Sequence, residues 1–161
     1  MGVDELPQAL KPFAGPWWVA GGCAVDLAVG AATRTHADLD VAVLRRDAPA
    51  LVELLGARSI GPHQLRADGF DLLLNEAADG EWIFRRDARV RRPLDEIGVE
   101  RSGLPVLAPE VVLLFKAKDP APKDEADREL LLPRLDAAGR DWLRTALETA
   151  YPGHPWLGVR W

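Results

Sequence analysis

Hydrophobic positions along the first two thirds of the chain switch between helical and strand spacing. Leu6, Leu10 and Phe13 have the spacing of a short helix over residues 4–13, which Gly15-Pro16 ends. Apolar runs predict strands at 17–20, 38–44, 70–75 and 82–86, and helices at 23–29 and 49–55. The Asp79-Gly80 pair between the last two strands predicts a hairpin turn.

The last third of the chain has the pattern of helices. Prolines near a first turn and amphipathic spacing predict helices at 109–116, 124–135 and 141–150, whereas 93–107 and the tail 152–161 are expected to be irregular. We therefore predict an α+β fold, a small mixed β-sheet with flanking helices and a helical C-terminal portion. Residues 1–107 would form its core, and residues 108–161 the helical portion of the same domain.

Composition narrows the class of protein. A length of 161 residues suits one domain, and the single cysteine excludes an intramolecular disulfide, which favours a reducing cytoplasm. No apolar stretch is long enough to span a membrane. The net charge of −5 argues against a nucleic-acid partner and would suit a small cationic substrate. Arginines cluster at 85–92, and we interpret them as solvated strand ends.

A glycine pair follows the first predicted strand and opens the next helix. Gly21 and Gly22 lack the side chains that would keep a phosphate from the backbone. The amides that begin the following helix, aided by the helix dipole, attract anions. This turn is therefore a candidate phosphate site.

Two aspartates open the second predicted strand. Asp38 and Asp40 would lie on one face, about 7 Å apart, with Leu39 on the other. Paired carboxylates are costly unless a cation neutralises them, and Mg²⁺ takes such ligands together with substrate phosphates. Asp71 opens the next strand, so it could be a third ligand or the general base that accepts the proton of an acceptor hydroxyl.

Each motif has a simpler interpretation when it stands alone. Gly21-Gly22 could be an ordinary turn, Asp38 and Asp40 solvated edge residues, and Asp71 a strand-end residue. Their order and spacing together favour a site for a metal and a triphosphate.

Most of the chain resembles a known enzyme family through several short segments. These segments are 18–26 (WVAGGCAVD), Gly30, 33–36 (TRTH), 38–43 (DLDVAV), 81–87 (EWIFRRD), 107–116 (LAPEVVLLFK) and 123–127 (KDEAD). They are similar to those of small antibiotic nucleotidyltransferases, namely the lincosamide nucleotidyltransferases and the 2″-aminoglycoside adenylyltransferases. The resemblance implies the polymerase-β-like nucleotidyltransferase fold.

The resemblance also implies roles for individual residues. Gly21 and Gly22 would contact the triphosphate, Asp38 and Asp40 would hold Mg²⁺, and Asp71 would be the third carboxylate, with Glu76 as an alternative. Arg34 and His36 would orient phosphates or the metal-binding strand, and Lys116, Lys123, Asp124 and Asp127 would lie near the nucleotide. One departure is Cys23, where the family often has Trp, and this leaves more room beside the glycine turn.

The expected activity is Mg²⁺-dependent transfer of a nucleoside monophosphate from a nucleoside triphosphate. AMP from ATP is the expected group, and another nucleoside triphosphate is the alternative donor. The acceptor would be a hydroxyl of a small molecule, such as an aminoglycoside or lincosamide antibiotic, and a homodimer would help to enclose it. Two alternatives stay open: modification of a macromolecule, as in a toxin–antitoxin pair, and a non-catalytic relative that binds nucleotide. Smaller expectations are a buried hydrogen bond or salt bridge of Asp26 that fixes the following loop, with Arg34 as a candidate partner, and surface positions for His63 and His154.

Overall fold

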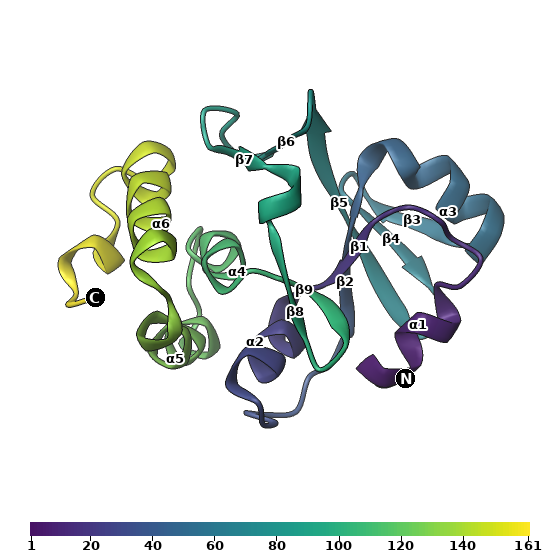
Figure 1. Cartoon of the computed structure of the whole chain (residues 1–161), viewed down its shortest axis with the longest axis horizontal. Helices are drawn as coiled ribbons and strands as arrows, with labels where there is room; N and C mark the ends of the chain where they lie inside the picture. The colour runs from purple at the N-terminus through teal and green to yellow at the C-terminus, as the bar shows by residue number, and fades with distance from the viewer.

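The computed structural model describes all of residues 1–161 as an α+β fold with one open mixed sheet, as predicted (Figure 1). The first half of the chain contains η1 (Val3–Glu5), α1 (Leu6–Ala9), β1 (Trp17–Val19), α2 (Gly21–Val29), β2 (Asp40–Leu44), η2 (Arg45–Asp47), α3 (Ala48–Leu55), β3 (Arg58–Gly61), β4 (Gln64–Ala67) and β5 (Phe70–Ala78). The second half contains β6 (Glu81–Ile83), β7 (Arg91–Pro93), η3 (Leu94–Glu96), β8 (Gly98–Arg101), β9 (Leu104–Leu107), α4 (Pro109–Lys116), α5 (Pro122–Leu131), η4 (Leu132–Arg134), α6 (Ala137–Ala150) and η5 (Pro155–Gly158).

The sheet has the strand order β3-β4-β5-β2-β1-β9-β8. β2 runs parallel to β5 and antiparallel to β1, while β1 runs parallel to β9. β6 and β7 form an extension that pairs with the end of β5. In Figure 1, α1 and α3 lie to the right of the central strands, whereas α4, α5 and α6 gather to the left and end near the C-terminus.

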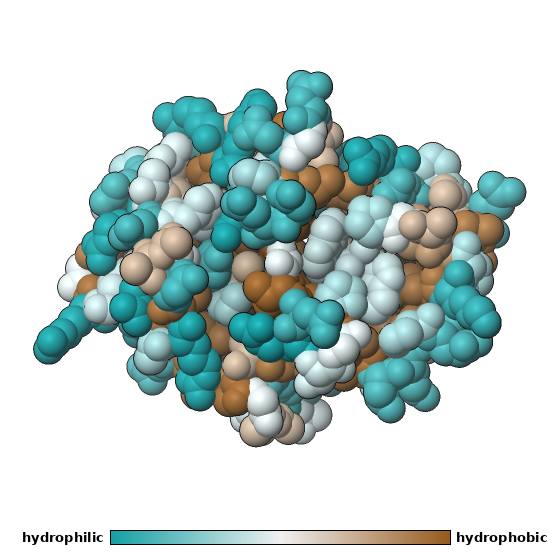
Figure 2. Space-filling model, in the orientation of Figure 1, coloured by the Kyte–Doolittle hydropathy of each residue, from teal (hydrophilic) through white to brown (hydrophobic).

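The hydrophobic core runs through the central strands and the helices beside them. Val41, Ala42, Val43 and Leu44 on β2 are all almost completely buried, because strands with helices on both faces bury successive side chains rather than alternate ones. This explains the continuous apolar run after Asp40. Hydrophilic residues cover most of the face in Figure 2. No helix has both the length and the apolar character required to cross a membrane.

The structure corrects several predicted elements. Residues 98–107, expected to be irregular, form the β8–β9 hairpin, whose turn uses positive φ at Ser102 and Gly103. The β3–β4 hairpin was not predicted either, because its strands have only four residues each. The strand expected from residue 38 begins at Asp40.

Gly139 falls between the helices predicted at 124–135 and 141–150, but in the structure it lies inside α6, which begins at Ala137. Its amide donates to the Asp136 carboxylate, which caps the helix, at 2.7 Å. A Cβ at this position would lie 3.3 Å from the Glu110 side chain. The glycine therefore permits close packing of α6 on α4 rather than ending a helix.

Candidate active site

A cleft of about 690 Å³ lies over the start of β2 and extends along β5 beneath α4. Its lining combines the glycine turn, the segment 34–38, β2, the β3–β4 turn, β5, the segment after β6, α4 and the start of α5. It contains Gly21, Gly22, Arg34, His36, Asp38, Asp40, Lys116, Lys123 and Asp124. Most of the residues predicted to form the site therefore share one cleft.

The glycine turn is packed against two of the predicted site residues. Gly21 has a φ of +59°, and a Cβ there would lie 2.3 Å from Oδ2 of Asp40. A Cβ on Gly22 would lie 2.2 Å from Nδ1 of His36. Any larger side chain would displace these groups, so both glycines are required by close approach, and Gly21 also by its backbone conformation.

Carboxylates concentrate at the start of β2. Asp40 is opposite Asp71 in the parallel β2–β5 register, and Asp38 lies two residues before it with a side chain that is 60% exposed. Burial, followed by the charges of Asp71 and Asp38, raises the pKa of Asp40, while Lys116 and Lys123 counteract the rise. Ionised Asp40 is thus destabilised by its surroundings, and a cation would relieve that cost.

Asp71 is adjacent to Asp40 but is occupied by other partners. Arg66 donates from Nε to Oδ1 at 2.6 Å and from Nη2 to Oδ2 at 2.7 Å, and Gln64 donates to Oδ2 at 2.7 Å. The hydrogen bonds from Arg66 hold the pKa of Asp71 below its usual value. Asp71 is 4% exposed and does not line the cleft, so Arg66 must move before this carboxylate can contact a ligand. The alternative residue, Glu76, pairs with Arg45 and also lies outside the lining.

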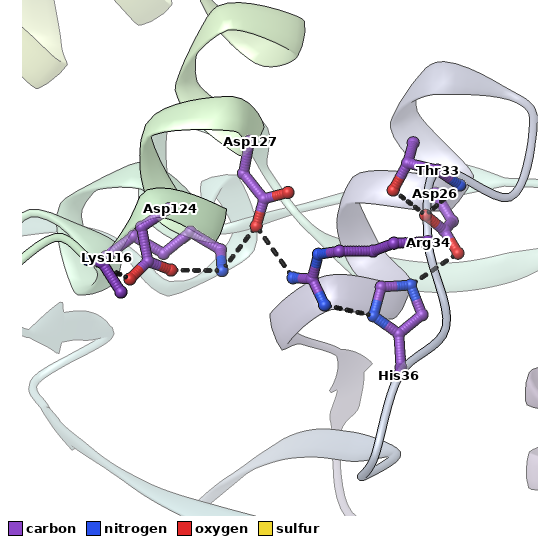
Figure 3. Close-up of polar contacts among 8 residues, drawn as sticks. Asp26, Thr33, Arg34, His36, Lys116, Asp124 and Asp127 are labelled. Carbon is purple, nitrogen blue, oxygen red and sulfur yellow. Dashed lines mark hydrogen bonds and ion pairs between the residues drawn. The ribbon is translucent and has the colours of Figure 1, made fainter.

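A chain of polar contacts holds Arg34 and His36 beside the glycine turn (Figure 3). Arg34 Nη1 lies 2.9 Å from His36 Nδ1, and His36 Nε2 lies 2.7 Å from Asp26 Oδ2. Because a guanidinium can only donate, Nδ1 must accept, and the His36 proton is on Nε2 and donated to Asp26. Thr33 donates to Asp26 from its amide and its hydroxyl. Asp26 thus makes the expected hydrogen bonds that fix the loop, but its partners are Thr33 and His36, and His36 stands between it and Arg34.

The same chain continues to the C-terminal helices through Asp127. This carboxylate is 1% exposed, and its Oδ2 lies 3.1 Å from Arg34 Nη2 and 2.8 Å from Lys116 Nζ. Lys116 also contacts Asp124 at 3.0 Å. Figure 3 shows Arg34 and Lys116 converging on Asp127 from opposite sides. The network thus fixes cations from distant segments at one end of the cleft.

Several cleft residues were not identified from the sequence. Arg85 and Arg86 line the cleft instead of forming only solvated strand ends, and His63 lines it while its Nδ1 contacts Arg45 at 2.6 Å. Gln64 and Asn75 complete this end of the lining. Gln64 lies on β4, whose pairing with β5 has its own turn motif at Asp68-Gly69, and Arg85 and Arg86 follow the β5–β6 hairpin with its Asp79-Gly80 turn. Neither motif shows by itself that these residues line the cleft. His154 is buried, with Nε2 2.6 Å from the Ala117 carbonyl oxygen, rather than at the surface.

Cys23 lies beside the turn without joining the cleft lining. Burial, and then the charges of Asp26 and Asp40, raise the pKa of its thiol. A raised pKa keeps the thiol protonated, and thus a poor nucleophile, near neutral pH.

The donor set of the cleft fits a magnesium ion that is completed by substrate. No group of three or more His, Cys, Asp or Glu side chains forms a closed metal site. Asp38 and Asp40 both line the cleft, with Asp40 packed against Gly21, and Mg²⁺ is usually held by one or two carboxylates together with waters and substrate phosphates. Burial disfavours the negative charge on Asp40, and a bound cation would offset this effect.

The fold is similar to that of antibiotic nucleotidyltransferases. The antibiotic-resistance factor ANT(2″)-Ia matches with a TM-score of 0.64 and 21% identity over 92% of this chain and 90% of that chain. Its crystal structure with adenylyl-2″-tobramycin also matches with a TM-score of 0.64, at 20% identity over 92% of this chain and 96% of that chain. The lincosamide antibiotic adenylyltransferase LnuA, in its lincomycin-bound form, matches with a TM-score of 0.63, at 17% identity over 84% of this chain and 99% of that chain.

The sequence itself carries the same likeness in its N-terminal part. A family model described as aminoglycoside-2″-adenylyltransferase matches residues 3–61, which include the glycine turn, Asp38 and Asp40. This match confirms the resemblance found in the motifs. A search among curated proteins finds no match.

Proposed function

We propose that this protein is a Mg²⁺-dependent nucleotidyltransferase that moves a nucleoside monophosphate, AMP from ATP, onto a hydroxyl of a small molecule. The observation that carries the proposal is the close approach of Asp40 to the glycine turn at Gly21. Burial and neighbouring carboxylates destabilise the ionised form of Asp40, and the positive charges of Lys116 and Lys123 act against this effect. A turn that accepts phosphate, a carboxylate pair that needs a cation and nearby lysines are the parts of a metal–triphosphate site.

The residues of the cleft divide the work of phosphate binding. The amides at Gly21 and Gly22 open α2 and face an incoming anion, while Arg34, Lys116 and Lys123 supply positive charge around it. His36 keeps Arg34 in place through the contact at Nδ1. Asp38 and Asp40 would hold the magnesium ion, which would polarise the α-phosphate and offset the charge of the leaving pyrophosphate.

The transfer itself needs one new bond and one proton acceptor. The acceptor oxygen bonds to the α-phosphorus, the bond from that phosphorus to the β-phosphate bridging oxygen breaks, and pyrophosphate leaves. The hydroxyl proton passes to a base, for which Asp71 is the nearest unassigned carboxylate once Arg66 releases it. Catalysis is then mainly positioning and charge neutralisation.

The structural neighbours suggest the first acceptors to test. Their ligands are a tobramycin derivative and lincomycin, so aminoglycosides and lincosamides are tested first, and activity on either class would make drug resistance the physiological effect. A cytoplasmic location and a homodimer that closes the cleft belong to the same proposal.

The test is pyrophosphate release by the purified protein with Mg²⁺, ATP or GTP, and the acceptor panel. Release that depends on one acceptor, disappears in Asp40→Asn and persists in Asp95→Asn would support the proposal. Asp95 is an exposed aspartate on η3 and controls for loss of charge alone. Nucleotide binding without release on any small molecule would favour a macromolecular acceptor. Absence of Mg²⁺–nucleotide binding would leave a relative that kept the fold and lost the chemistry.

A further inference from the structure

The cleft has a charge balance opposite to that of the whole protein. The chain carries a formal net charge of −5, yet six Lys or Arg and four Asp side chains line the cleft. The acidic composition, which suggested a cationic substrate, is therefore misleading about the cavity in which the substrate would bind. The sign of charge within the lining is the better guide to the acceptor.

Ion pairs compensate only two of the six lining cations, and both of these, Arg34 and Lys116, lie at the glycine-turn end. At the end formed by the glycine turn, Arg34 and Lys116 form ion pairs with Asp127, and Lys116 forms another with Asp124. At the other end, Arg85 and Arg86 form no ion pair with any carboxylate. An anion bound there would meet charge that the protein itself leaves unbalanced.

The two ends are separated along the sheet. Asp71 pairs with Asp40 at the start of β2, and Asn75 in the lining is four residues further along β5, or about 13 Å at the rise of a strand. Ile83 pairs with Glu76 in the antiparallel β5–β6 hairpin, so the chain runs back along β5 and Arg85, two residues later, comes about level with Leu74. Phosphates held by the glycine turn are thus at the opposite end from Arg85.

Packing holds one of these arginines in place and leaves the other available. Arg86 donates from Nη1 to the Phe115 carbonyl oxygen at 2.9 Å, its guanidinium carbon lies 5.7 Å from the Phe115 ring centre, and its Nε is buried without a partner. Arg85 is exposed and has no hydrogen-bond partner.

A polycationic acceptor would find little compensation in this lining. Asp38 and Asp40 are assigned to magnesium and Asp124 is paired with Lys116. The remaining lining carboxylate, Asp119, is next to Lys118 in the sequence. Like charges brought together at an interface weaken binding substantially.

We propose, on the premise of the nucleotidyl transfer above, that the acceptor carries an anionic group, phosphate or carboxylate, which binds Arg85 and Arg86. The acceptor hydroxyl would then be directed toward Asp40 from the end of the cleft opposite the glycine turn. The substrate class is therefore a hydroxylated anion and differs from the polycationic aminoglycosides.

Binding to nucleotide-loaded protein tests this assignment without a known acceptor. The full chain is first saturated with Mg²⁺ and the non-hydrolysable analogue α,β-methylene-ATP, and that binding is measured by calorimetry. Inorganic phosphate, acetate and tobramycin are then titrated separately at low ionic strength, where electrostatic contacts are least screened. Phosphate and acetate distinguish the two anionic groups.

The expected result is binding of phosphate or acetate that Arg85→Gln weakens about tenfold, the scale of one charge-assisted hydrogen bond. Arg101→Gln should leave the affinity unchanged, because Arg101 is an exposed arginine in the β8–β9 hairpin that contacts only its neighbour. Since Arg85 is exposed and makes no hydrogen bond, its replacement does not threaten folding; Arg86→Gln gives a second measurement.

Three results would overturn the proposal. One is anion binding that is absent, or equal in wild type and Arg85→Gln. Another is a loss of analogue affinity in Arg85→Gln, which would place this arginine against the nucleotide. The third is tobramycin binding more tightly than either anion. If the wild type fails to bind the Mg²⁺–analogue at all, the proposed nucleotidyl transfer is refuted first, and the inference with it.

Discussion

The Asp127 carboxylate offers a sharp test of what holds the cleft together. It is 1% exposed, and one of its oxygens serves both Arg34 and Lys116. Asp127→Asn keeps the size and an acceptor oxygen but removes the charge. Each charge-assisted hydrogen bond contributes about 1.5–3 kcal/mol. The loss of stability should be smaller than that caused by leaving a buried charge with no partner. After the substitution Lys116 still pairs with Asp124, and the Arg34 side chain is 30% exposed to solvent.

We therefore expect Asp127→Asn to lower the free energy of unfolding by about 2–3 kcal/mol. For a domain of this size the melting temperature should fall by roughly 4–12 °C. Urea unfolding followed by tryptophan fluorescence measures the first quantity and calorimetry the second. Glu129→Gln is the matched control, since this carboxylate lies on the same helix with a side chain that is 73% exposed, and should change stability by less than about 0.5 kcal/mol.

A double-mutant cycle with Lys116→Met separates the ion pair from other effects of Asp127. A shared interaction requires a coupling energy of at least about 1 kcal/mol between the two changes. Additive losses, or a loss in Asp127→Asn no larger than that of the Glu129 control, would refute the view that this buried carboxylate joins the two segments.

Three further predictions concern the carboxylates and the turn. Asp40→Asn should make the metal-free protein more stable at pH 7. Because the pKa of Asp40 is raised in the folded protein, its ionised form lowers the stability of the wild type above that pKa. The stability advantage of Asp40→Asn should therefore vanish as the pH falls below 3.8, the ordinary pKa that Asp40 has in the unfolded chain. Equal urea midpoints for variant and wild type at both pH 7 and low pH would contradict this. Gly21→Ala should lose about 1–2 kcal/mol from left-handed strain and also lose Mg²⁺–nucleotide affinity through collision with Asp40, whereas Gly30→Ala, with φ +83° and open space, should show the strain alone. Arg66→Met should raise the pKa of Asp71, so if Asp71 is the base the acid limb of the rate profile moves to higher pH; an unmoved limb would exclude that role.

The local motifs were predictable because their signals lie within a few residues. The strand, glycine turn and helix at 17–29 follow directly from apolar residues interrupted by Gly21-Gly22. The apolar runs after Asp40 and Asp71 identified two buried strands, and their parallel pairing brings the two carboxylates side by side. A short hairpin turn at Asp79-Gly80, with positive φ at both residues, was equally clear.

What the sequence did not reveal depends on partners from distant segments. Arg66 reaches Asp71 only because β4 folds back on β5. The turn between these strands, Asp68-Gly69 with positive φ at Gly69, carries the same Asp-Gly signal as Asp79-Gly80, but no strand was predicted at 64–67 to pair across it. Asp26 was assigned to Arg34 by proximity in sequence, but the intervening loop places His36 between them. The uncompensated charge of Arg85 and Arg86 is likewise visible only when the cleft is assembled.

The position of β1 has a consequence for how the chain reaches this structure. β1 lies between β2 and β9, with Val19 opposite both Val41 and Val106, and β2 needs β5 on its other side. Residues 3–61, the stretch with the family match, therefore hold the glycine turn and the Asp38–Asp40 pair but neither outer neighbour of these two strands. Pairings so distant in sequence slow folding. During synthesis this stretch must wait until residue 107 has emerged, and a fragment cut after residue 61 should remain unfolded although its sequence still contains the glycine turn and the Asp38–Asp40 pair.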